Sequence, residues 1–100
     1  MTMSIRGTGR AVLATPGTAV VLGTTVRGQF VRVTALESND NVVVIGDSGA
    51  LAGGNADILG TRSGTPLQVN ESHDFYVNDV NQLYLDGVTA GDGVTWTVFD

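Results

Sequence analysis

The 100-residue chain has no cysteine, no lysine, one histidine and only two glutamates. The absence of cysteine excludes disulfide bonds, thiolate catalysis and zinc or iron–sulfur centres held by cysteine. His73, Glu37 and Glu71 leave few groups that transfer protons, and one histidine forms neither a histidine-rich metal site nor a catalytic triad. We therefore expect a protein that is not an enzyme, with no catalytic residues, no metal and no cofactor.

Two further absences concern location. Residues 1–7 lack the apolar stretch of a signal peptide, and no apolar run approaches the ~20 residues that span a bilayer. We expect a protein that is made in a cytoplasm and contacts no membrane. A chain of this length forms one domain, which buries roughly two-thirds of the surface that the unfolded chain exposes.

Acidic residues are missing from the first 36 positions, where four arginines give a charge of +4. Residues 37–100 hold ten acids and one arginine, giving −9 and a net charge of −5 for the chain. This asymmetry favours an interaction segment or an oriented assembly. The alternative is that the arginines pair with acids across the fold, where each exposed pair contributes only ~0–1 kcal/mol. Four arginines are too few for nucleic-acid binding.

What the chain does contain is typical of β-strands, with 15 valines and 12 threonines between clusters of glycine, asparagine and aspartate. We predict an all-β fold, a single β-sandwich or jelly-roll-like domain of about seven to nine short antiparallel strands over residues 10–100. The predicted strands are residues 10–14, 18–22, 29–36, 42–45, 57–59, 66–69, 73–77, 83–86 and 94–99. The predicted core is Val31, Val33, Val44, Leu67, Phe75, Leu83, Leu85, Trp96 and Val98.

Two segments are candidate interaction surfaces. Residues 1–9 show little pattern and are predicted to be an N-terminal arm, in which Ile5 and Arg6, together with Arg10, contact a partner. Because the core begins after Arg10, removal of the arm is expected to leave the domain folded. The run of Val42, Val43, Val44 and Ile45 requires cover on both faces, either inside the fold or from another subunit, and is a candidate subunit interface.

Several motifs have a simpler structural explanation. Residues 46–49, with the sequence Gly-Asp-Ser-Gly, resemble a serine-nucleophile motif, but we interpret them as a turn. His73 is expected at the surface. The side-chain oxygens that calcium might use match no EF-hand spacing, and they belong to Asp74, Asn78, Asp79, Asn81, Asp86 and Asp92. The aromatic residues would form either core and edge or a sugar-stacking platform, and they are Phe30, Phe75, Tyr76, Tyr84, Trp96 and Phe99.

Two patterns in the C-terminal half stand in a fixed order. Residues 64–77 contain the pattern G-x-P-L-x-x-x-E-S, and residues 78–85 contain the strand pattern D-hydrophobic-x-x-L-Y. They lie between the apolar run at residues 42–46 and the closing strand at 94–99. In these patterns and their order, about residues 42–99 resemble a group of small virion proteins from tailed bacteriophages. The resemblance implies a structural role, in head decoration (cement) proteins or small fibre-associated modules that are usually trimeric, and it implies no catalytic residues.

The resulting hypothesis is a non-enzymatic capsid decoration protein on the outer surface of the virion head. Its partners would be the major capsid protein and itself, as a homotrimer, with no nucleic acid and no membrane. It would stabilise contacts between major capsid subunits through avidity on the lattice. The alternatives are a tail or fibre-associated module and a sugar-binding β-sandwich module.

Overall fold

The computed structural model describes residues 4–50 and 64–100, which form eight strands and one short 3-10 helix. Valine is the most frequent residue in the strands, and turn residues separate them, as their propensities require. In chain order the elements are β1 (Ile5–Val12), β2 (Val20–Val21), β3 (Phe30–Ala35), β4 (Val43–Gly46), β5 (Thr65–Leu67), β6 (Ser72–Phe75), η1 (Val80–Gln82), β7 (Tyr84–Gly87) and β8 (Gly93–Phe99). The all-β prediction is confirmed, while the expected strand at residues 57–59 lies outside the described residues.

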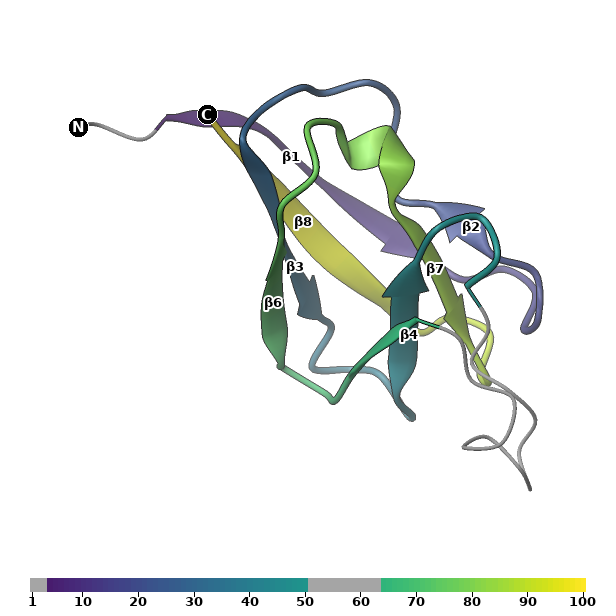
Figure 1. Cartoon of the computed structure of the whole chain (residues 1–100). Helices are drawn as coiled ribbons and strands as arrows, with labels where there is room; N and C mark the ends of the chain where they lie inside the picture. The colour runs from purple at the N-terminus through teal and green to yellow at the C-terminus, as the bar shows by residue number, and fades with distance from the viewer. Residues whose placement is uncertain (1–3, 51–63) are drawn as a thin grey trace.

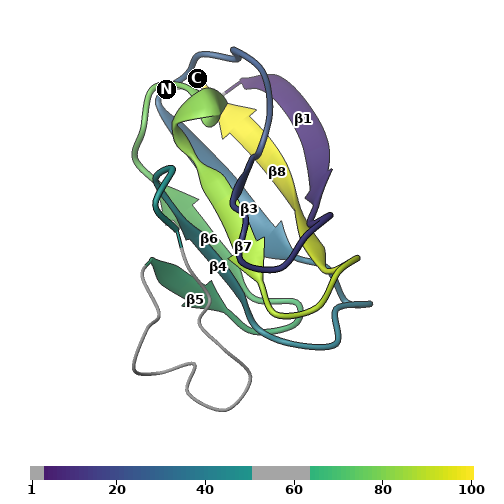
Figure 2. The ribbon, with the colours of Figure 1, turned by 90° about the vertical axis from the view of Figure 1, so that its right-hand side faces the viewer.

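The strands form a nested antiparallel ribbon. β1 pairs with β8, β2 with β7, β3 with β6 and β4 with β5, so the first half of the chain runs alongside the second half. The ribbon also wraps on itself, because β3 pairs with β8 and β4 with β7. The result is two four-stranded sheets with the orders β1-β8-β3-β6 and β2-β7-β4-β5 (Figures 1 and 2). This connectivity is that of a jelly roll.

The core lies between the two sheets and follows the alternation of each strand. Val31 and Val33 of β3 and Val98 of β8 point inward and are fully buried. They meet Ile45 and Leu85 of the other sheet in one hydrophobic cluster. Of the predicted core, Phe75 alone is only half-buried, because β6 is an edge strand of its sheet. The alternating pattern of the sequence therefore predicted the interior well.

The N-terminal arm is corrected by the structure. Ile5 to Val12 form β1, which pairs with β8 along its length, so residues 5–9 are part of the sandwich. Gly9 lies opposite Trp96, and a side chain at Gly9 would overlap the indole ring. Glycine is therefore required at this position by the close approach of the ring. Residues 1–3 lie outside the described residues.

The structure also contains the predicted Pro-Gly turn at residues 15–18. Thr18 N–H donates to the Thr15 carbonyl (3.1 Å), and Gly17 has a φ of 88°, as a Pro-Gly turn requires. The flanking strands β1 and β2 do not pair with each other, because the turn carries the chain from one sheet to the other. Gly17 N–H donates to the buried carboxylate of Asp86 (2.9 Å), which fastens this turn to β7.

The nested ribbon brings the basic first third of the chain beside the acidic last third, so opposite charges of the sequence can pair. Arg6 pairs with Asp100 at 3.6 Å, and Arg32 makes two hydrogen bonds to Asp74, at 2.7 and 3.0 Å. The hydrogen bond from Arg32 holds the pKa of Asp74 below its ordinary value of 3.8. The prediction that arginines pair with acids across the fold is confirmed for these side chains.

Candidate functional site

The three residues predicted to contact a partner lie on β1, which is an edge strand. Ile5 is 63% exposed, and Arg6 and Arg10 also point to solvent. The register shifts between Ile5 and Gly7, so Arg6 occupies a β-bulge. Among the described residues Arg10 forms no ion pair. The structure therefore brings the predicted residues together on one strand, as an ordered surface.

The free edge of β1 carries unpaired backbone groups. Leu13 N–H donates to the Asp92 carbonyl (2.8 Å), and bonded residues alternate along an antiparallel pair. In this register Gly7 and Gly9 bond to β8, while the N–H and C=O groups of Thr8 and Arg10 point away from it. We call Ile5–Val12 with these outward groups the β1 edge. An unpaired edge of this kind is a template for another strand.

The candidate subunit interface is corrected. Val43, Val44 and Ile45 are fully buried within the single chain, and Val42 is half-buried. β4 lies between β5 and β7, and Val43 and Ile45 belong to the hydrophobic cluster. The run is therefore central in the fold, and Val43, Val44 and Ile45 offer no surface to a second subunit.

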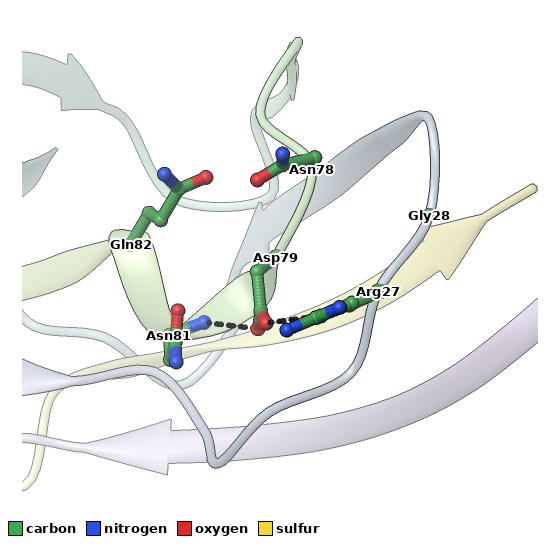
Figure 3. A pocket seen from close by; sticks show the side chains of 6 residues that line it. All are labelled: Arg27, Gly28, Asn78, Asp79, Asn81 and Gln82. Atoms are coloured by element: carbon green, nitrogen blue, oxygen red, sulfur yellow. Dashed lines mark hydrogen bonds and ion pairs between the residues drawn. The ribbon is translucent and has the colours of Figure 1, made fainter.

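A polar depression lies where the loop before β3 meets the loop before β7. Its first part has a volume of about 500 Å³ and is lined by Arg27, Gly28, Asn78, Asp79, Asn81 and Gln82 (Figure 3). A second part of about 380 Å³ shares Gly28, Asn78 and Gln82 and extends to Gln29, Tyr76 and Val77. We call the two parts together the Asn78 groove. Sequence analysis missed it, because no motif spans two loops about 50 residues apart in the chain.

Asp79 fastens the two loops of the groove together. Its Oδ1 accepts from the backbone N–H groups of Val26 and Asn81, both at 3.1 Å, and it thereby caps η1. Its Oδ2 lies 3.8 Å from Arg27 Nε. Gly28 N–H donates to the Asn78 carbonyl (3.1 Å), and Val80 N–H donates to the Val26 carbonyl (3.2 Å). The floor of the groove is thus held by backbone contacts from both loops.

Two of the other acids considered as calcium ligands, Asp86 and Asp92, also accept hydrogen bonds from backbone N–H groups. Asp92 accepts from the N–H groups of Asp40 (2.9 Å) and Asn41 (3.1 Å), and Asp86 accepts from Gly17. Within residues 4–50 and 64–100, no three acidic or histidine side chains lie together in a way that would hold a metal ion. These carboxylates are therefore loop anchors.

The remaining motifs take local structural roles. Asp47 accepts from the Gly49 N–H (2.8 Å), so the Gly-Asp-Ser-Gly segment begins with a turn after β4. His73 is exposed on β6, and its ring contacts Phe75 with centroids 4.7 Å apart. In the segment that carries the virion-protein resemblance, Glu71 accepts from the Gln68 N–H (2.8 Å) and closes the turn between β5 and β6. That pattern therefore encodes a turn.

The aromatic side chains divide between core and surface. Trp96 is 7% exposed, and its indole N–H donates to the Leu22 carbonyl (2.9 Å). Phe30 stacks on Phe99 with centroids 4.9 Å apart, on the outer face of the sheet. Tyr76 contacts Phe30 at 5.5 Å and is 80% exposed at the groove. A continuous aromatic platform is therefore absent from the described residues, where one exposed ring lies beside the polar groove.

No family model matches the chain, and neither a curated protein nor a solved structure matches it. Among the described residues, no helix has the length and apolar character needed to cross a membrane.

Proposed function

We propose that the protein is a bacteriophage capsid decoration protein that binds the outer head surface and stabilises contacts between major capsid subunits. The observation that carries the proposal is the β1 edge, an ordered strand with free backbone groups and exposed Ile5, Arg6 and Arg10. Jelly rolls are frequent among viral capsid proteins, although a fold alone does not assign a function. The pattern resemblance at residues 64–85 points in the same direction.

The mode of binding follows from the chemistry of the β1 edge. An extended segment of a capsid subunit would add to the sheet as a new strand, with its N–H and C=O groups bonded to those of Thr8 and Arg10. The two arginines of β1, in a region without acids, favour an acidic segment. Two copies of β1 paired antiparallel about Thr8 would instead set arginines opposite each other, which disfavours self-pairing.

The assembly in this proposal is a homotrimer at the local three-fold positions of the head. Each copy would bring one β1 edge to a neighbouring capsid subunit, so three weak contacts act together. The alternative location, a tail or fibre, changes the partner and keeps the same surface.

The experiment is a pull-down with undecorated heads of the virus whose genome encodes the chain. Thr8→Pro removes one outward N–H without breaking a bond to β8, and edge strands tolerate proline at such positions. We expect Thr8→Pro and Arg10→Glu to bind heads at least about ten-fold more weakly, a loss of ~1.4 kcal/mol. Gln68→Glu, which alters an exposed side chain on the turn between β5 and β6, is the control and should bind normally.

Thermal midpoints must be compared in parallel, so that weak binding is not confused with unfolding. If folded Thr8→Pro and Arg10→Glu decorate heads as well as the unaltered protein does, the β1 edge is not the contact. The glycine-rich segment at residues 46–64 then becomes the next surface to test, although its residues 51–63 lie outside the described residues.

A further inference from the structure

We propose that the Asn78 groove binds a neutral saccharide, with Tyr76 as the stacking surface and the amides of Asn78 and Gln82 as its hydroxyl partners. This site is separate from the β1 edge and does not depend on the proposed capsid role. Both parts of the groove, at about 500 and 380 Å³, fall in the ~300–1,000 Å³ range of small-molecule sites.

The lining supplies polar groups without partners. Among the described residues, the side-chain amides of Gln29, Asn78 and Gln82 make no hydrogen bond, and all three are exposed. Figure 3 shows the amides of Asn78 and Gln82 on the same side of the groove, with an open space between them. A primary amide both donates and accepts, and this dual capacity matches a hydroxyl group, which does the same.

The charge of the groove indicates a neutral ligand. Its two charged side chains, Arg27 and Asp79, lie 3.8 Å apart and have opposite sign. The Asp79 carboxylate is also occupied by the N–H groups of Val26 and Asn81. A cationic ligand would have to compete with these contacts for Asp79, and an anionic ligand would find Arg27 alone, with the Asp79 carboxylate beside it. A hydroxyl-rich neutral ligand meets neither obstacle.

Tyr76 supplies the apolar contact that such a ligand needs. Its ring is 80% exposed, an unusual state for a large aromatic side chain, and its contact with Phe30 holds it beside the groove. The C–H face of a pyranose ring packs on an aromatic ring, while its hydroxyls remain free for the amides. An exposed aromatic next to free amides is therefore suited to a sugar and poorly suited to an apolar side chain, since the rest of the groove is polar.

The groove is also shaped in advance. Gly28 lies at its floor, and a Cβ there would collide with the Phe99 carbonyl and Val98, so the position admits no side chain. The backbone bond from Gly28 to Asn78 and the capping by Asp79 hold the two loops in place. Little ordering is therefore required on binding. A shallow site with few contacts is expected to bind weakly, with Kd on the order of 1 mM.

The test is a titration of the ¹⁵N-labelled protein with maltose, cellobiose, lactose and N,N′-diacetylchitobiose, each to about 50 mM, well above a Kd of ~1 mM. At least one of these sugars should shift the backbone amide signals of Gly28, Asn78 and Gln82. Tyr76→Phe should retain binding because the ring remains. Tyr76→Ala should raise Kd about ten-fold, equivalent to ~1.4 kcal/mol.

The double variant Asn78→Ala, Gln82→Ala should lose binding, and Gln68→Ala is the matched control for loss of an exposed amide elsewhere. Arg10→Glu should bind sugar normally, so this result is separate from the head pull-down. The proposal is wrong if none of the four sugars shifts the groove signals. It is also wrong if the folded Tyr76→Ala and double variants bind as the unaltered protein does.

Discussion

Gly9→Ala is the substitution that most directly tests the place of β1 in the fold. Gly9 lies on the inner face of β1, opposite Trp96, and an added Cβ would overlap the indole ring. The ring cannot move aside, because its N–H is bonded to the Leu22 carbonyl (2.9 Å). A Cβ placed at Gly23 would be 2.7 Å from the same ring. Two glycines therefore approach the indole closely.

The sign of the effect distinguishes an ordered strand from a loose arm. In an unhindered strand position, Gly→Ala stabilises by roughly 0.5–1 kcal/mol, because the unfolded chain loses freedom. Overpacking of a filled core costs about 1–3 kcal/mol, and the overlap at Gly9 is severe. Because the overlap is severe, the cost lies in the upper part of this range, and after the gain of roughly 0.5–1 kcal/mol we expect a net destabilisation of about 1–2.5 kcal/mol. In a domain of this size each kcal/mol lowers the thermal midpoint by about 4–8 °C.

The assay is urea and thermal unfolding of Gly9→Ala beside Thr8→Ala, an exposed neighbour on the same strand. Thr8→Ala should change stability by no more than about 0.5 kcal/mol. A Gly9→Ala protein as stable as the unaltered protein, or more stable, would refute the packing of β1 on Trp96. Residues 5–9 would then have to be treated as an arm.

Three further predictions address other contacts. Deletion of residues 1–9 should lower the thermal midpoint by well over about 5 °C, because it removes five of the eight residues of β1 and uncovers Trp96. An unchanged midpoint in calorimetry would contradict this. Asn39→Ala should cost about 1–3 kcal/mol in urea unfolding, because Asn39 bonds both backbone groups of Gly93, at 2.7 and 2.9 Å, in a buried position; a neutral result would show that water replaces it. Asp74→Asn should be less stable than the unaltered protein above about pH 5, and the difference in stability should vanish as the pH falls through 3.8 and below. The reason is that a carboxyl group with a depressed pKa stabilises the fold only when it is ionised. A difference in stability that persists at about pH 2 would contradict the ion pair.

The strands with strict alternation were predictable from the sequence. In β3 and β8 every second side chain is apolar, and those side chains lie in the core. The first part of β1, residues 5–9, escaped prediction because two of its inward positions are Gly7 and Gly9, which carry no apolar signal. The space that their side chains would occupy is filled by Val26 and Trp96, which come from elsewhere in the chain. Local periodicity cannot reveal a strand when the side chains that cover its inner face come from other parts of the chain.

For the apolar run at residues 42–45, the prediction of burial was correct, and the suggestion that another subunit supplies the cover was wrong. Continuous apolar character indicated burial on both faces, and Val43 to Ile45 are fully buried. The choice between the fold and a second subunit depended on topology, which is encoded in the pairing of distant strands. The fold packs Val43 and Ile45 into the cluster between the two sheets, and Gly64 lies against Val44 on the other face, so the chain covers both faces of β4 itself.

The sequence showed the charge asymmetry but not which arginines and acids pair, because those pairs depend on the same topology. A ribbon that pairs its first strand with its last brings a basic beginning beside an acidic end, and Arg6 with Asp100 is the direct consequence. The Asn78 groove has the same origin, because residues 27–29 and 76–82 meet only through the pairing of the two halves. Its one signal in the sequence was the density of amides at residues 78–82, which also suits a turn. Arg10, by contrast, lies on the β1 edge, and among the described arginines it is the one whose charge the fold leaves without an ion pair.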